Sequence, residues 1–257
     1  MSEQRKKAEI RAFSELDYTA NEAMNTLATN ISYCGEDIKV IEFTSRYQHE
    51  GKSFVAMNLM RTFASFGKTV VMVDADLRRS SIISKYRVSF SEPKPAGLAQ
   101  YLAGINSISD VIYETNIPGA YMVPVGRLVS NSLQLLKSER LKRLIDALAE
   151  SADIVLIDTP PAGLIVDAVE IAKHCDGAII VVDYEEGHKR EIADVSNSLT
   201  RAGCDVLGAV INAVDMNSYS NKKYYYSGKY YRKYYGGSYG SYYKAREEDE
   251  SKNGSKK

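Results

Sequence analysis

The sequence predicts an α/β fold with a doubly wound, mostly parallel sheet, followed by a tyrosine-rich tail. After residue 37, short β-branched runs alternate with longer stretches whose apolar residues recur every three or four positions. Several short runs are apolar on both alternating faces, which is typical of strands that helices cover on both sides. From residue 217 this pattern stops, and tyrosine, glycine, serine and basic residues replace it. We therefore expect an N-terminal helical segment at 1–36, an α/β domain at 37–216 and a disordered tail at 217–257.

The alternation defines the expected elements of the domain. The six expected strands are Ile38–Ser45, Thr69–Ala75, Ala120–Pro124, Asp153–Asp158, Gly177–Asp183 and Val206–Asn212. Helical periodicity is clear around 55–63, 133–148 and 192–199. Ahead of the first strand, Leu16 to Ile31 also show helical spacing, with Ser14 as the expected N-cap residue. We expect this leading helix to be extra to the core.

Composition excludes several classes of protein. The 257 residues carry no formal net charge and are 44% hydrophobic, so we expect neither global disorder nor a nucleic-acid partner. The three cysteines, Cys34, Cys175 and Cys204, are far apart, which argues against a disulfide framework and indicates a reducing cytoplasm. No apolar run approaches the roughly 18 residues that span a bilayer. Any membrane association is therefore expected to come through a partner.

A strand-to-helix turn carries the residues of a phosphate-binding loop. Residues 46–53 read Arg-Tyr-Gln-His-Glu-Gly-Lys-Ser. Such a loop aims backbone N–H groups at phosphates, while its lysine reaches the β and γ oxygens and its hydroxyl binds Mg²⁺. Position 46 is arginine where the usual pattern has glycine, so an ordinary helix N-terminus is the alternative for this segment. The expected nucleotide-binding residues are Tyr47, Gln48, His49, Glu50, Gly51, Lys52, Ser53 and Phe54.

Two further strands end in carboxylates. Asp74 and Asp76 end one strand and Asp158 ends another. Ligands of open α/β sheets lie beyond the carboxyl ends of the strands, where acids hold Mg²⁺ or its waters and can accept a proton from an attacking hydroxyl. A helix N-cap is the alternative for the first pair. The expected metal ligands are Ser53, Asp74, Asp76 and Asp158. The expected catalytic residues are Lys52, Asp74, Asp76 and Asp158, with either Asp74 or Asp76 as the base.

With these motifs the chain resembles the bacterial tyrosine kinases encoded in capsular and exopolysaccharide loci, which are relatives of the MinD and ParA ATPases. The resemblance covers roughly residues 22–215 and the tail. Residues 46–53 resemble the Walker A segment, 74–79 the family's second Walker motif and 153–161 its Walker B segment. Position 47 is tyrosine where the MinD and ParA ATPases carry a signature lysine, which favours a kinase. The resemblance implies a P-loop NTPase fold that uses ATP and Mg²⁺.

The resemblance also implies partners. Standalone members depend on a membrane-anchored activator of the polysaccharide co-polymerase type, which would bring this chain to the inner face of the plasma membrane. A cognate tyrosine phosphatase and a homo-oligomer are also implied. The family's rings use Glu-x-x-Arg-x-x-Arg on the leading helix, but the corresponding positions here are Glu22, Asn25 and Ala28. His49 stands where the family usually has glycine, so the loop has less conformational freedom.

The tail is the expected substrate. Its expected phosphorylation sites are Tyr224, Tyr225, Tyr226, Tyr230, Tyr231, Tyr234, Tyr235, Tyr239, Tyr242 and Tyr243. Residues 219–246 contain seven Lys or Arg and no acid, so phosphates of about −1.5 to −2 charges each would reverse the sign of this segment. The alternative for the tail is a low-complexity segment that binds anionic polymer or lipid.

The sequence thus predicts an ATP-dependent tyrosine autokinase that modifies its own tail and regulates capsular or exopolysaccharide synthesis and export. Two alternatives stay open at this point. A MinD- or ParA-like ATPase would hydrolyse ATP without making phosphotyrosine, and a catalytically weak scaffold would bind nucleotide and stay unmodified.

Overall fold

The computed structural model describes residues 6–185 and 189–214, and the structural statements that follow refer to these residues. Residues 1–212 form one compact unit, and the second unit begins at Ala213. The tail predicted at 217–257, with all its expected phosphorylation sites, lies outside the described residues. The predicted division into three segments therefore stays a prediction.

The described chain contains a nine-stranded sheet with helices on both faces. The strands are β1 (Lys7–Glu9), β2 (Val40–Ser45), β3 (Val70–Asp74), β4 (Ser89–Phe90), β5 (Tyr113–Thr115), β6 (Ala120–Val123), β7 (Ile154–Asp158), β8 (Gly177–Asp183) and β9 (Asp205–Asn212). The helices are α1 (Tyr18–Ser32), α2 (Lys52–Ser65), α3 (Ile82–Lys85), α4 (Leu98–Leu102), α5 (Ser132–Leu136), α6 (Glu139–Ser151), α7 (Val166–Ala172) and α8 (Lys189–Arg201).

The sheet is mostly parallel, as predicted. Its strand order is β4-β1-β5-β6-β3-β7-β2-β8-β9. Six of the eight strand pairings among the described residues are parallel, and the antiparallel pairs are β1–β4 and β5–β6. All six strands expected from the sequence are present, each within two residues of its expected bounds. The central strands β3, β7 and β2 bring the ends of three motif-bearing segments to one edge of the sheet.

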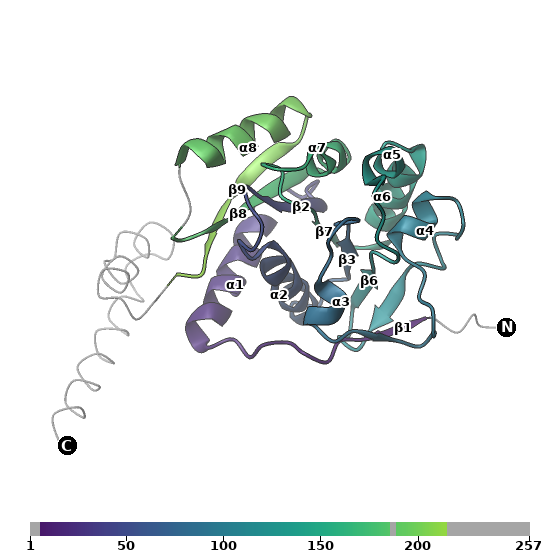
Figure 1. The fold of residues 1–257 in the computed structure, drawn as a ribbon. Coiled ribbons are helices and arrows are strands. Elements are labelled where there is room, and N and C mark those ends of the chain that lie inside the picture. The colour runs from purple at the N-terminus through teal and green to yellow at the C-terminus, as the bar shows by residue number, and fades with distance from the viewer. Residues whose placement is uncertain (1–5, 186–188, 215–257) are drawn as a thin grey trace, which may run out of the picture. The chain divides into compact units, whose positions relative to one another are not determined.

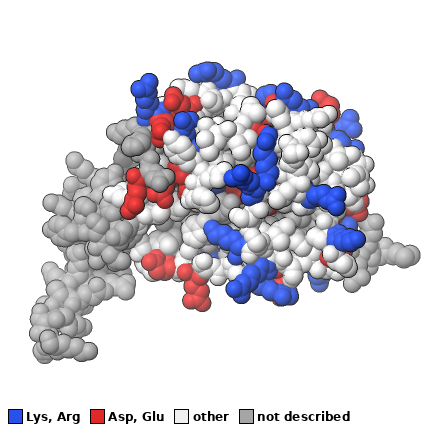
Figure 2. All heavy atoms as spheres, viewed as in Figure 1, with Lys and Arg blue, Asp and Glu red and all other residues white. Residues whose placement is uncertain are grey.

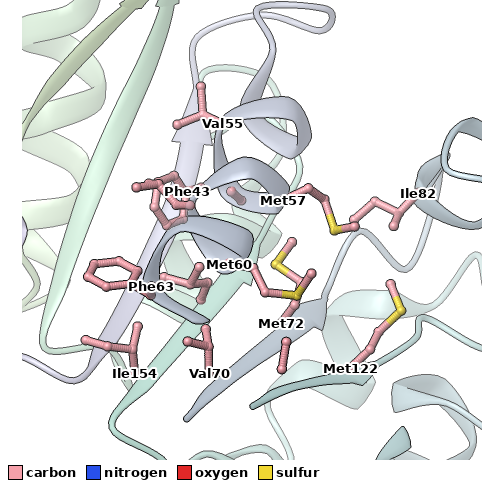
Figure 3. Packing of buried hydrophobic residues seen from close by; sticks show 14 of the residues in the cluster. Phe43, Val55, Met57, Met60, Phe63, Val70, Met72, Ile82, Met122 and Ile154 are labelled. Atoms are coloured by element: carbon pink, nitrogen blue, oxygen red, sulfur yellow. The ribbon is translucent and has the colours of Figure 1, made fainter. Parts of the chain in front are cut away.

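Apolar side chains fill both faces of this sheet, which confirms the doubly wound arrangement. The first face is covered by α1, α2 and α3, and the other by α4 to α8 (Figure 1). On the first face, side chains of α2 lie against those of the central strands, with Met60 pointing toward Met72 and Phe63 lying near Phe43 (Figure 3). Because α2 is packed in this way, its N-terminus is fixed at the strand ends.

The N-terminal region differs from the expectation in three ways. Strand β1 precedes the helix and pairs with β4 and β5. The N-cap of α1 is Asp17, whose side chain accepts a hydrogen bond from the Ala20 N–H, so the expected cap at Ser14 was wrong. The helix is also part of the core, because Met24, Ala28 and Ile31 belong to the same buried cluster as α2. None of the helices in the described ranges is long and apolar enough to cross a membrane.

Candidate active site

The loop between β2 and α2 is held in shape by its own side chains. The carboxylate of Glu50, which is only 2% exposed, accepts a hydrogen bond of 2.6 Å from the Tyr47 N–H. The Ser45 hydroxyl donates to the Tyr47 carbonyl at 2.5 Å. The Tyr47 hydroxyl, in turn, donates to Glu191 of α8 at 2.8 Å. These bonds close the loop into a turn and attach it to a neighbouring helix.

Two residues of the loop have left-handed backbone conformations. Gly51 has a φ of 93° and His49 a φ of 67°. Gly51 is required for a second reason, since a Cβ there would lie 1.9 Å from the amide nitrogen of Asn212. That amide donates to the Glu50 carbonyl at 3.1 Å, so the end of β9 touches the loop. His49 is not a glycine, yet it adopts the left-handed conformation, which costs most residues about 1–2 kcal/mol.

Lys52 begins α2 and points into a buried, acidic environment. Lys52 is only 9% exposed. Burial lowers the pKa of the ammonium group, whereas the charges of Asp158, Asp76 and Glu50 raise it. An ammonium group at a helix N-terminus, close to backbone N–H groups, suits phosphate oxygens. The Gly-Lys-Ser turn therefore has the geometry that a phosphate-binding loop requires.

Asp74 and Asp158 meet at the ends of adjacent strands. They occupy paired positions in the register of β3 and β7. Ser53 donates to one oxygen of Asp158 at 2.5 Å, and Ser80 donates to one oxygen of Asp74. Burial raises the pKa of Asp158 to about 6. Burial, followed by the nearby charge of Asp158, raises the pKa of Asp74 well above its usual value.

These side chains fit a bound Mg²⁺. Oδ1 of Asp74 and Oδ1 of Asp158 are buried and have no hydrogen-bond partner within the described part of the chain. Buried carboxylate oxygens without partners are costly, and a divalent cation between them would satisfy both. Within the described ranges no three His, Cys, Asp or Glu residues form a complete metal cage. Mg²⁺ typically binds through one or two carboxylates, waters and substrate phosphates, which is the donor set that Ser53, Asp74 and Asp158 provide.

The remaining predicted residues are distributed differently. Asp76 is partly exposed, and its Oδ1 accepts hydrogen bonds from the N–H groups of Arg78 and Arg79 at 3.2 and 2.9 Å. It therefore organises the turn after β3, but it is not a helix N-cap, because α3 begins at Ile82 with Ser81 as its N-cap residue. Its charge still acts on Asp158 and Lys52. Gln48 is exposed, and Phe54, which belongs to α2, is partly buried and packs against the core.

Comparisons with known proteins agree with this geometry. The family model described as an AAA domain matches residues 38–202. Tyrosine-protein kinase CpsD of Streptococcus pneumoniae serotype 4 is 35% identical over 198 residues, which is 77% of this chain and 86% of that protein. The chain belongs to this tyrosine-protein kinase family.

Solved structures place this family member among P-loop proteins. The kinase domain of the Escherichia coli tyrosine kinase ETK superposes with a TM-score of 0.73 at 27% identity, covering 77% of each chain. The septum site-determining protein MinD from Pyrococcus horikoshii, solved with Mg-ADP, superposes with a TM-score of 0.60 at 25% identity, covering 70% of this chain and 72% of that one. The fold is thus that of nucleotide-binding proteins.

Sequence reasoning missed two contacts of the candidate site. Asn212 holds the phosphate-binding loop from β9. Its position at the end of a predicted parallel strand was the signal, because such ends meet at one edge. Ser80 bonds to Asp74 from the turn after β3. Nothing in the sequence distinguishes this serine from its neighbour Ser81, since the contact depends on how the turn folds back.

Proposed function

We propose that the protein transfers the γ-phosphoryl group of Mg-ATP to tyrosine hydroxyls of its own C-terminal tail and thereby regulates capsular or exopolysaccharide synthesis and export. The observation that supports this most is the convergence of Lys52 with the Asp74–Asp158 pair, whose Oδ1 atoms have no partner in residues 6–185 and 189–214. Family membership supports tyrosine as the acceptor. The tyrosine-rich end of the sequence supplies acceptors within the same molecule.

Each side chain has a proposed role. Lys52 binds the β and γ oxygens and stabilises the charge that develops on them in the transition state. Ser53, Asp74 and Asp158 hold Mg²⁺, whose chemistry is to neutralise the phosphate oxygens and orient them. Asp76 is the proposed acceptor of the phenolic proton, because it is partly exposed whereas Asp74 is fully buried. An incoming tail can reach only an accessible carboxylate.

The proposal includes the implied partners. A membrane-anchored activator of the polysaccharide co-polymerase type would recruit the chain from the cytoplasm to the inner face of the plasma membrane, and a tyrosine phosphatase would reverse the modification. Homo-oligomerisation would let one subunit present its tail to another. The leading helix shows Asn25 and Ala28 where the family's ring contact has arginines, so a different contact would have to hold such an oligomer.

The test uses the full chain, co-expressed with its candidate membrane activator and then incubated with Mg-ATP. Mass spectrometry of residues 217–257 is expected to find several phosphotyrosines. Lys52→Met should abolish them, while Lys94→Met, which changes an exposed lysine without a described contact, should leave them intact. Release of phosphate without phosphotyrosine would instead favour a MinD-like ATPase. Binding of Mg-ATP without either product would favour a scaffold.

A further inference from the structure

A shallow, open depression lies beside the proposed site of phosphoryl transfer. It has a volume of about 360 Å³ and is lined by Arg78, Arg79, Leu128, Val129 and Ser130. The two arginines follow Asp76 by two and three residues, so their Cα atoms lie within roughly 11 Å of it. The Val129 N–H donates to the Leu77 carbonyl at 2.9 Å, which joins the two walls of the depression.

One arginine of the depression is fixed by a buried acid. Arg78 donates from Nε and Nη2 to the two oxygens of Asp167, at 2.8 and 3.2 Å. The Asp167 side chain is 1% exposed and accepts a further bond of 2.6 Å from Ser132. The third guanidinium nitrogen of Arg78, Nη1, takes part in neither of the two bonds to Asp167. The guanidinium is therefore held in place with donor capacity left over.

The second arginine adds an exposed cation to the depression. Arg79 is exposed, and within the described residues its side chain has no hydrogen bond or ion pair. Its backbone N–H is fixed by Asp76 at 2.9 Å. The lining thus contains two guanidinium groups and no acid, while the carboxylates bonded to these residues are Asp167, which holds the Arg78 side chain, and Asp76, which accepts the two backbone N–H groups. An anion in the depression would gain charge-assisted hydrogen bonds from both.

The opposite wall is apolar. Leu128 is a large hydrophobic residue with 49% of its surface exposed, and Val129 next to it is partly buried. Charge alone would not select this location, since basic groups spread over much of the face drawn in Figure 2. The combination of fixed arginine, free arginine and apolar wall selects a ligand with an aromatic ring and an anionic end.

We propose that this depression binds a phosphotyrosine of the tail while a neighbouring tyrosine occupies the transfer site. The inference rests on the proposed function. The tail places tyrosines in adjacent runs at 224–226, 230–231, 234–235 and 242–243. Because 219–246 is basic before modification, the arginines repel it, and the first phosphate converts repulsion into binding. Later transfers should therefore be faster than the first.

The binding test uses the dephosphorylated full chain, saturated with Mg-ADP so that the phosphate-binding loop is filled. The probes are a synthetic peptide of residues 222–236 with a phosphate on Tyr231, the same peptide without phosphate, and inorganic phosphate. We expect the phosphopeptide to bind about tenfold more tightly than the unmodified peptide. Arg79→Ala should remove this preference, and Arg143→Ala, an exposed arginine on α6, should keep it.

Three results would overturn the inference: equal binding of the two peptides, an unchanged preference in Arg79→Ala, or inorganic phosphate that competes as well as the phosphopeptide. Leu128→Ser serves as a second variant, because it should weaken the phosphopeptide without changing the charge. The binding measurement requires no phosphoryl transfer. The depression can therefore be found to bind the phosphopeptide even if the tail is never modified, and it can be found not to bind it even if the tail is modified.

Discussion

Asp74 and Asp158 are register partners at the ends of the adjacent parallel strands β3 and β7, and each has one buried carboxylate oxygen without a hydrogen-bond partner among the described residues. Each of two neighbouring carboxyl groups raises the free energy needed to ionise the other. The strand register enforces the pairing, because both residues are fixed by main-chain hydrogen bonds in the middle of the sheet. The arrangement is thus poised to take up a cation, and its protonation competes with that uptake.

The first prediction is that Mg-nucleotide affinity falls at acidic pH. Burial raises the pKa of Asp158 to about 6, and that of Asp74 also lies well above its usual value. Below pH 6 a proton must leave before the metal binds, so the apparent affinity for Mg²⁺ should drop about tenfold per pH unit. Titration with Mg²⁺ and a fluorescent ATP analogue between pH 5 and 7.5 measures this. A flat profile would contradict the proposed ligands, and Asp158→Asn should bind weakly at every pH.

The second prediction concerns Glu50 as the organiser of the phosphate-binding loop. Its carboxylate accepts the Tyr47 N–H at 2.6 Å from a buried position. Glu50→Ala should leave that donor unpaired and weaken nucleotide binding by roughly 1–3 kcal/mol. Glu50→Gln keeps an acceptor and should lose much less. Calorimetric titration with Mg-ATP distinguishes them, and equal losses in both variants would argue that charge, not loop geometry, is the role of this residue.

The third prediction concerns Glu42, which is buried in the centre of β2. Thr159 donates to one of its oxygens at 2.8 Å, and the other oxygen has no partner. Burial raises the pKa of Glu42 from 4.5 to about 8. The folded protein therefore keeps a proton that the unfolded chain loses. The contribution of Glu42 to the free energy of unfolding is therefore greatest below pH 4.5. It declines by about 1.4 kcal/mol per pH unit as the pH rises toward 8.

Glu42→Gln tests that linkage. The amide can still accept from Thr159 but does not titrate, so the variant should gain stability relative to the natural chain as the pH rises from 5.5 to 8. Urea unfolding of both proteins at pH 5.5, 7 and 8 gives the comparison. A constant difference across this range would mean that Glu42 is not protonated in the fold.

The long central strands could be predicted from the sequence because their signal is local. Ile154–Asp158 is a run of apolar residues ending in an acid, and parallel strands bring such ends together without further information. The same rule placed Lys52, Asp74 and Asp158 at one edge. It could not show that Asp74 and Asp158 are paired neighbours, because strand order is a property of the whole sheet.

The short outer strands could not be predicted. β1 has three residues and β4 has two, which is too short for any periodicity to be visible. Their conformation is determined by partners distant in sequence, as Ala8 pairs with both Phe90 and Thr115. The left-handed backbone of His49 was likewise not predicted, because histidine in place of the family's usual glycine was expected to restrict the loop, whereas the loop keeps the conformation that glycine favours.

The last prediction tests how the N-terminal arm is attached. Asn116 follows β5, and its side chain accepts from the Ile10 N–H at 2.8 Å and donates to the Ile10 carbonyl at 3.1 Å. These two bonds extend the pairing of β1 by one residue, so Asn116→Ala should free the arm at a cost of roughly 1–3 kcal/mol. Trypsin should then cut faster after Lys7 and Arg11, as N-terminal sequencing of the products would show.

Asn106→Ala is the matched control for this experiment, because no described hydrogen bond involves the Asn106 side chain. It should leave the cleavage rate unchanged. Equal rates for Asn116→Ala and the natural chain would indicate that the β1 pairing and the bonds from Arg11 and Ala12 to the Tyr86 carbonyl hold the arm without Asn116. Faster cleavage confined to Asn116→Ala would show that one side chain, distant in sequence, anchors the arm to the sheet.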